Sequence, residues 1–156
     1  MRTFNLLAAT LAPDDEYRPG FHRASARVGD AIGGERIGAT LYELGDGERV
    51  CPYHYHHGVE EWLYVVSGTP TVRMPAGERV LREGDALCFP NGPEGAHDVR
   101  GPARVLILST NRRADGWPTI AAYPDSDKLG TRPGEYDSDR LNFRRADAVD
   151  YWDGEE

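Results

Sequence analysis

The chain has 156 residues, 39% of them hydrophobic and 28% charged, which is the balance of a globular domain rather than of a disordered segment. Its formal net charge of −8 at pH 7 argues against nucleic-acid binding, because phosphate recognition relies on clustered Lys and Arg. No apolar run reaches membrane-spanning length, and the apolar stretch at 6–12 is a poor signal peptide, so we expect a cytoplasmic protein without a membrane partner.

Short strands separated by tight turns are predicted along most of the chain. Residues 1–24 are typical of an extended arm with at most one strand, and from about residue 25 the pattern becomes strand, turn, strand. Strand-forming runs then recur at roughly 8–12 residue spacing, which is typical of a sandwich or barrel. The strands predicted on this basis cover residues 36–44, 49–56, 61–67, 71–74, 79–81, 86–89, 96–99 and 104–109. No segment between residues 36 and 109 has a convincing helical period.

The last part of the chain is polar and rich in Pro, Gly and Asp. A short helix is predicted within residues 145–152. The tail also carries large apolar side chains, which indicate that it packs on the barrel or on a second subunit: Tyr123, Leu141, Phe143, Tyr151 and Trp152. No linker or repeat divides the sequence, so we expect one domain over residues 1–156, with a barrel core at about 36–109 and a tail at 110–156.

Four of the five histidines lie in two short segments. The first segment has the pattern His-x-His-x4-Glu-x6-Gly and runs from His54 to Gly68, and the second ends at His97. Residues i and i+2 of a strand point to the same face, so His54 and His56 project together while His57 projects to the other side. Three imidazoles and one carboxylate at these spacings predict a site for one divalent transition-metal ion, whether Mn, Fe, Ni, Co or Zn.

These two segments resemble the two conserved motifs of the cupin superfamily. The similarity extends over Gly47 to Gly68 and over Gly84 to His97, and some flanking stretches resemble small bacterial cupins. The resemblance implies an all-β fold: a double-stranded β-helix, or jelly-roll barrel, here with an extended N-terminal arm and a polar C-terminal tail. It also implies a metal-binding protein, in which the metal ligands carried over from the family are His54, His56, Glu61 and His97.

The sequence departs from the family pattern in three places. Six residues separate Gly47 from His54 where the family usually has five, and four separate Gly92 from His97 where two are common. An asparagine often found four positions after the last histidine is Gly101 here. The adjacent residues Glu60 and Glu61 cannot both point inward, and the family's six-residue spacing to the motif glycine favours Glu61.

Other candidate residues are less well defined. Glu94 precedes His97 and is a candidate general acid or base, although a loop carboxylate in water or in a salt bridge is the favoured interpretation. Arg73 and Arg79 would bind an anionic substrate only if they pointed inward, and a solvated strand face is the simpler expectation. The two cysteines, Cys51 and Cys88, form no disulfide framework, so we expect free, buried thiols; a Cys51–Cys88 disulfide is the alternative and requires neighbouring strands.

The predicted site is compatible with more than one function. One hypothesis is a metal-dependent small-molecule enzyme, such as an isomerase, dioxygenase or lyase acting on a sugar or carboxylate, with its ligand inside the barrel. The alternative is a non-catalytic module that binds or senses a small ligand. A metal-free cupin that uses a histidine as base is a third possibility, against which the four ligand types argue. Because both ends of the chain form long arms, we also expect a homodimer.

Overall fold

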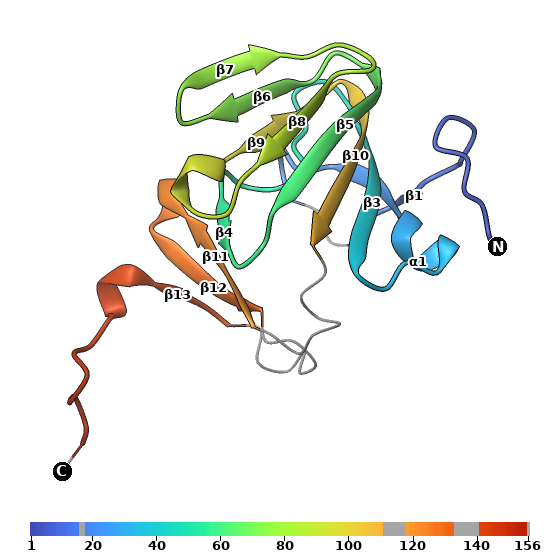
Figure 1. Ribbon diagram of the computed structural model, residues 1–156. Coiled ribbons are helices and arrows are strands. Elements are labelled where there is room, and N and C mark those ends of the chain that lie inside the picture. Colours follow the sequence, from blue (N-terminus) through green and yellow to red (C-terminus); the bar gives the residue numbers. More distant parts are fainter. Residues whose placement is uncertain (16–17, 111–117, 133–140, 156) are drawn as a thin grey trace.

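The computed structural model describes residues 1–15, 18–110, 118–132 and 141–155, and within them almost all regular structure is β-strand (Figure 1). The strands are β1 (Ala12–Pro13), β2 (Arg23–Arg27), β3 (Ile37–Leu44), β4 (Tyr55–His57), β5 (Glu61–Gly68), β6 (Thr71–Met74), β7 (Gly77–Val80), β8 (Ala86–Phe89), β9 (Asp98–Arg100), β10 (Ala103–Thr110), β11 (Thr119–Tyr123), β12 (Lys128–Arg132) and β13 (Asn142–Arg144). The helical segments are α1 (Val28–Ile32) and the 3₁₀ turns η1 (Pro93–Gly95), η3 (Pro124–Ser126) and η5 (Arg145–Asp147). The all-β, jelly-roll class predicted from the sequence is confirmed.

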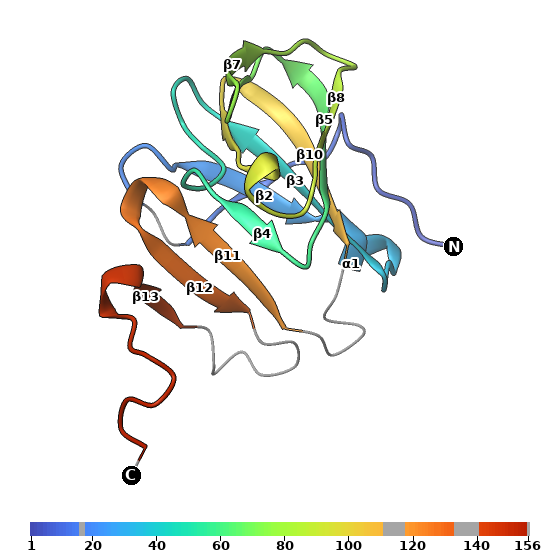
Figure 2. The same ribbon diagram turned by 60° about the vertical axis from the view of Figure 1, so that its left-hand side comes forward.

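The described strands form three antiparallel sheets. The largest has the order β1-β2-β3-β10-β5-β8, the second the order β13-β12-β11-β4, and the third the order β7-β6-β9. Isolated bridges join Arg49 to Arg100 and His54 to His97, which connect the loop before β4 with the segment around β9. Figure 2 shows the second sheet lying beside the other two, with β4 at its inner edge.

The main core lies between the largest sheet and the sheet of β6, β7 and β9. Alternation along β5 divides its side chains: Leu63 and Val65 are fully buried, whereas Trp62 is 52% and Tyr64 39% exposed. The same alternation on the neighbouring strands completes a cluster of buried residues: Leu44, Val50, Leu63, Val65, Val72, Leu81, Phe89, Val99, Ala103 and Val105. This packed interior fixes the directions of the strands that carry the histidines.

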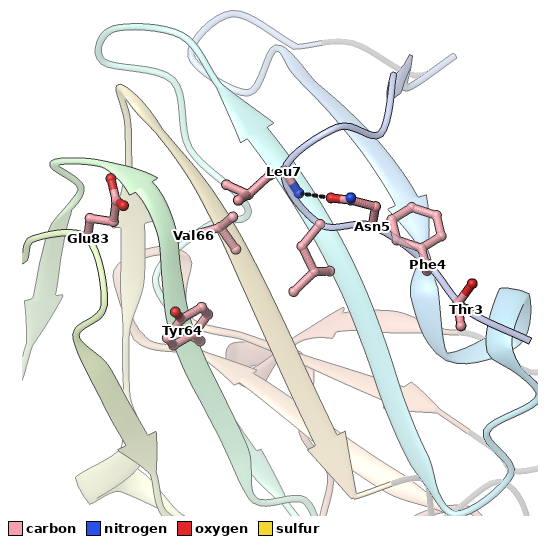
Figure 3. Close-up of a pocket in the computed structure, with 8 residues that line it drawn as sticks. Thr3, Phe4, Asn5, Leu7, Tyr64, Val66 and Glu83 are labelled. Atoms are coloured by element: carbon pink, nitrogen blue, oxygen red, sulfur yellow. Dashed lines mark hydrogen bonds between the residues drawn. The ribbon is translucent and has the colours of Figure 1, made fainter.

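The N-terminal arm covers part of the outer face of the largest sheet. Leu11 and Val28 pack there with Leu41 and Val66, and Phe4 and other apolar residues of the arm lie against them. Between the arm and β5 runs a groove of about 560 Å³ (Figure 3), lined by Thr3, Phe4, Asn5, Leu6, Leu7, Tyr64, Val66 and Glu83. The helix α1 was not predicted, because five residues are too few to show a helical period.

Three sequence predictions about local structure need correction. The strand predicted at 49–56 is reduced to β4, since Pro52 has no N–H to give to a ladder and the chain bends there. The polar tail forms the strands β11, β12 and β13, which its Pro and Gly content concealed. The helix predicted within 145–152 is only the turn η5, because so short a segment does not overcome the cost of helix nucleation. Among the described helices, none is long and apolar enough to cross a membrane.

Candidate metal centre

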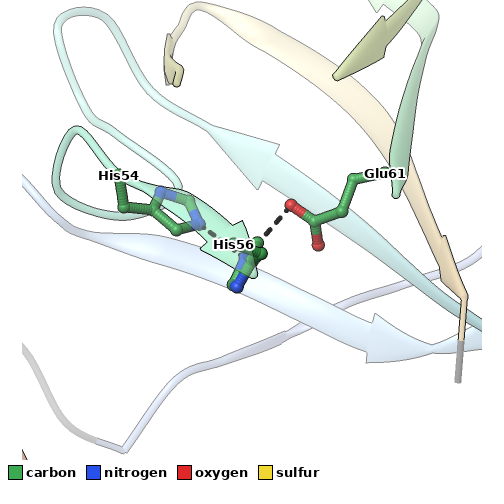
Figure 4. A group of neighbouring side chains, drawn as sticks. All are labelled: His54, His56 and Glu61. Carbon is green, nitrogen blue, oxygen red and sulfur yellow. Dashed lines mark hydrogen bonds and ion pairs between the residues drawn. The ribbon is translucent and has the colours of Figure 1, made fainter. Parts of the chain in front are cut away.

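Four side chains from the two predicted motifs meet at one end of the interior. His56 lies on β4 and Glu61 is the first residue of β5, while His54 and His97 lie immediately before β4 and β9. The backbones of His54 and His97 exchange two hydrogen bonds, with N–O distances of 3.1 and 2.8 Å, which hold the two rings side by side. Figure 4 shows His54, His56 and Glu61 pointing toward one another.

The nitrogen and carboxylate atoms of this cluster converge. Nε2 of His54 lies 3.0 Å from Nε2 of His56, and Oε2 of Glu61 lies 3.3 Å from that atom and 3.5 Å from Nε2 of His97. Ligands bound to one ion at about 2.0–2.1 Å, with angles of about 90–110°, lie about 2.8–3.4 Å from one another. The ligand atoms of His54, His56 and Glu61 all lie within 4.8 Å of one another, and His97 joins the group through its approach to Glu61.

Backbone carbonyls fix the orientation of two of the rings. Nδ1 of His54 lies 3.0 Å from the oxygen of Pro52, and Nδ1 of His97 lies 2.9 Å from the oxygen of Gly95. When Nδ1–H donates to these carbonyls, each Nε2 keeps its lone pair and faces the cluster. Nε2 of His97 is buried and has no hydrogen-bond partner among the described residues. A buried nitrogen in this state fits a metal ligand, because an unpaired polar atom in the interior is otherwise costly.

Aromatic rings enclose the cluster on two sides. Phe89 stacks on His97 with ring centroids 3.7 Å apart and an interplanar angle of 7°. Tyr123 of β11 stacks on His54 with centroids 5.9 Å apart and an angle of 22°. The thiol of Cys51 lies 3.4 Å from Nδ1 of His54. Apolar surroundings of this kind exclude water and strengthen the electrostatic interactions inside.

The protonation states of the cluster favour cation binding. Burial lowers the pKa of His54 to about 3, and the neighbouring His97 and His56 lower it further than burial alone would. Burial also lowers the pKa of His97, although the negative charge of Glu61 acts in the other direction and raises it. Burial on its own would raise the pKa of Glu61, but the hydrogen bond with His56 and the electrostatic interaction with the three histidines outweigh it and lower this pKa. Neutral rings of His54 and His97 beside an ionised Glu61 are the forms that bind divalent metals.

The neighbours of these residues in the sequence point away from the cluster. His57 and Glu60 are exposed, and the Glu60 carboxylate accepts a hydrogen bond of 2.9 Å from the indole of Trp62. Glu94 is exposed on η1 and is not part of the cluster. Burial raises the pKa of the Cys51 thiol. Both cysteines are free, as expected, but Cys88 is exposed and not buried.

Arg73 and Arg79, the candidate anion-binding residues of the middle hairpin, are not free cations inside the site. Nη1 and Nη2 of Arg73 donate to the carboxylate of Asp125, at 2.6 and 2.9 Å. The guanidinium carbon lies 3.9 Å from the ring centroid of Tyr53. Arg79 is exposed on β7. Packing of Tyr123 was predicted, but its stacking on His54 was not, because this contact depends on the pairing of β11 with β4.

Comparison with known proteins agrees with this description. Residues 40–109 match the family model of the cupin domain. A crystal structure from Acidithiobacillus ferrooxidans, provisionally titled a sugar phosphate isomerase, has a TM-score of 0.78 and 24% identity over 92% of this chain and 90% of its own. A cupin from Silicibacter pomeroyi titled a sugar phosphate isomerase has a TM-score of 0.76 and 23% identity over 97% and 98% of the two chains.

The fold is shared with a protein of different activity as well. The polyketide cyclase RemF from Streptomyces resistomycificus superposes with a TM-score of 0.56 and 19% identity, over 70% of this chain and 79% of its own. No curated protein matches the chain in sequence. Residues 40–109 are therefore a cupin domain, and the two motifs that carried the resemblance both lie within these residues.

Proposed function

We propose that the chain is a metal-dependent isomerase of a sugar or sugar phosphate, with one divalent ion held by His54, His56, Glu61 and His97. The observation that carries the proposal is the convergence of three Nε2 atoms and one carboxylate oxygen, linked by distances of 3.0, 3.3 and 3.5 Å. A set of three nitrogens and one oxygen suits Mn, Fe, Ni, Co or Zn and leaves coordination positions for a ligand.

The metal ion and the residues around it have different roles in such a site. A divalent ion supplies Lewis acidity toward the carbonyl and neighbouring hydroxyl of an open-chain sugar. The carbonyls of Pro52 and Gly95 hold the His54 and His97 rings with Nε2 turned inward, while Phe89 packs against one of them. Isomerisation is favoured over the dioxygenase and lyase reactions because two structures covering more than 90% of this chain carry that title.

Turnover on a panel of aldoses, ketoses and their phosphates tests this function. The metal-loaded protein should convert at least one aldose–ketose pair, and His56→Ala should lower kcat/KM by about 100-fold or more, because ligand loss costs at least as much as loss of an outer-shell partner. His57→Ala is the matched control and should keep wild-type rates, since His57 is exposed. Equal activity of His56→Ala and wild type would refute the role of the cluster.

A non-catalytic ligand-binding function is the alternative, and one observation favours it. Among the described residues, Glu61 is the only carboxylate paired with these histidines, so no second carboxylate accompanies the proposed ligands as a general acid or base. A protein that binds one metal ion and a sugar phosphate but converts none of the panel would support this alternative over the isomerase.

A further inference from the structure

The second sheet presents more than histidines on the face that looks into the site. Ala121 of β11 pairs with His56, and Gly130 of β12 pairs in turn with Ala121. Directly paired residues of antiparallel strands share a face, and residues two apart share it as well. This face therefore carries Arg132 and Lys128, on either side of Gly130, together with the ring of Tyr123 that stacks on His54.

The guanidinium of Arg132 is held across this face. Its Nη2 donates to the hydroxyl of Tyr123 at 2.9 Å, and its Nη1 donates to the carbonyl of Thr131 at 2.9 Å. A Cβ on Gly130 would lie 2.5 Å from Oδ1 of Asn142 and 2.9 Å from Nη1 of Arg132, so the absence of a side chain there leaves room for both groups. One aromatic ring, that of Tyr123, thus separates the cation from His54.

Within the described part of the chain, these two cations have no carboxylate partner. Arg132 and Lys128 are both partly buried, and among the described residues neither forms an ion pair. Nζ of Lys128 instead lies 5.3 Å from the ring centroid of Tyr123. In contrast, carboxylates neutralise Arg23, Arg73, Arg100 and Arg104. Two unneutralised cations beside a candidate metal centre, in a chain of net charge −8, create a local site for an anion.

We propose that Arg132 and Lys128 bind the phosphate group of a phosphorylated substrate whose other end reaches the histidine cluster. Two positive charges match the charge of about −2 that a phosphate monoester carries near neutral pH, and a guanidinium is suited to its oxygens. This inference rests on the proposed function, because it names the substrate class of the same site. Arg132 and Lys128 are specificity-determining residues in this account and not catalytic residues.

Calorimetric binding of three matched probes tests the inference. The three probes differ only at position 6 of the sugar. Glucose 6-phosphate has a phosphate there, glucuronate a carboxylate and glucose a neutral hydroxyl. Wild-type protein of measured metal content should bind glucose 6-phosphate at least about 10-fold more tightly than the other two, because its phosphate offers about two negative charges to the two cations, whereas a carboxylate offers one and a hydroxyl none. Arg132→Gln should lose about 10- to 100-fold in affinity for the phosphate and leave glucose binding unchanged.

Three variants complete the experiment. Arg132→Lys should restore part of the preference, and Gly130→Ala should weaken it by displacing the guanidinium. Arg79→Gln removes an exposed cation elsewhere and should change nothing. Metal content and melting temperature are measured for each variant, and Lys128→Gln replaces Arg132→Gln if the latter does not fold.

The outcomes separate this inference from the function on which it rests. Unchanged phosphate affinity in Arg132→Gln, equal binding of glucuronate, or no binding of glucose 6-phosphate to the wild type would each overturn it. A protein without metal or turnover that still shows an Arg132-dependent phosphate preference would refute the isomerase and leave the phosphate site standing. Loss of metal in Glu61→Gln with the phosphate preference retained would show that the two sites are separate.

Discussion

His54 illustrates how burial sets the chemistry of a single residue. It is 6% exposed, and its pKa of about 3 in the folded protein compares with an ordinary value of 6.5. The folded state keeps the ring neutral, whereas the unfolded chain takes up a proton as the pH falls below 6.5. The stability contributed by His54 is therefore complete above this pH and is lost as the pH falls toward about 3.

Acid titration of the metal-free protein tests this effect. We predict that the free energy of unfolding, measured by urea denaturation at a series of pH values, declines between pH 6.5 and about 3. His54→Gln should make the decline shallower, and His57→Gln should not change it, because His57 is exposed. A free energy of unfolding that stays constant over this interval would contradict the assigned burial.

Gly68 shows why the first motif ends in glycine. Its φ is 87°, and a Cβ would lie 2.7 Å from the carbonyl oxygen of Pro102 and 2.8 Å from Cα of Ala103. Gly84 has nearly the same φ, 88°, but open space around it. Both positions favour glycine by backbone conformation, and only Gly68 is also closed to a side chain by its neighbours.

Comparing Gly68 with Gly84 separates the cost of the left-handed backbone conformation from the cost of the close contact with neighbouring backbone. Gly84→Ala should lower the free energy of unfolding by about 1–2 kcal/mol, the cost of a left-handed conformation. Gly68→Ala should cost more than this, because backbone atoms of the β10 segment must move as well. The measurement is chemical denaturation of the two variants, and equal losses would contradict the close approach.

At the scale of elements, the tail strand β11 supports the strand that carries His56. Ala121 is fully buried opposite His56, and Ile120 on the other face is 40% exposed. We predict that Ala121→Leu costs about 1–3 kcal/mol through overpacking and weakens metal binding by displacing His56. Ile120→Leu should change neither the stability nor the metal affinity by much. Calorimetric metal titration beside thermal unfolding checks this, and normal metal affinity in Ala121→Leu would contradict it.

The sequence predicted elements well where local pattern and packing agree. Residues 61–67 and 86–89 alternate or carry β-formers between clear turns, and they are β5 and β8 in the structure. The six-residue spacing to Gly68 also predicted that Glu61, and not Glu60, turns inward beside the histidines. Sequence pattern failed for β11 and β12, because β11 depends on its pairing with β4, and β12 on its pairing with β11, rather than on their own composition. Arg132 was missed for the same reason, since its direction follows from that register.

On the scale of the whole molecule, large apolar side chains remain uncovered. Trp62 is 52% and Ile37 58% exposed, and both line a groove of about 300 Å³ on the outer face of the largest sheet. In the tail, Tyr151 and Trp152 are 83% and 72% exposed. Exposed apolar groups that gather on one surface commonly mark protein interfaces.

We therefore predict a homodimer. Light scattering at micromolar concentration should give twice the 17.3 kDa mass of the chain. Trp62→Glu should weaken the dimer if the sheet face is the interface, and Arg79→Gln, which changes an exposed residue of β7, should leave it intact. A mass of 17.3 kDa for the wild type would refute the prediction.

The central claim is that the four converging side chains hold one divalent metal ion. Elemental analysis of protein purified without a metal-binding tag tests it most directly, with the adjacent glutamates as a matched pair. We predict about one ion per chain in the wild type and in Glu60→Gln. Metal affinity should fall by about 10- to 100-fold or more in Glu61→Gln, because of these two glutamates only Glu61 contacts the histidines. No bound metal under any loading condition, or equal affinity in the two variants, would contradict the claim.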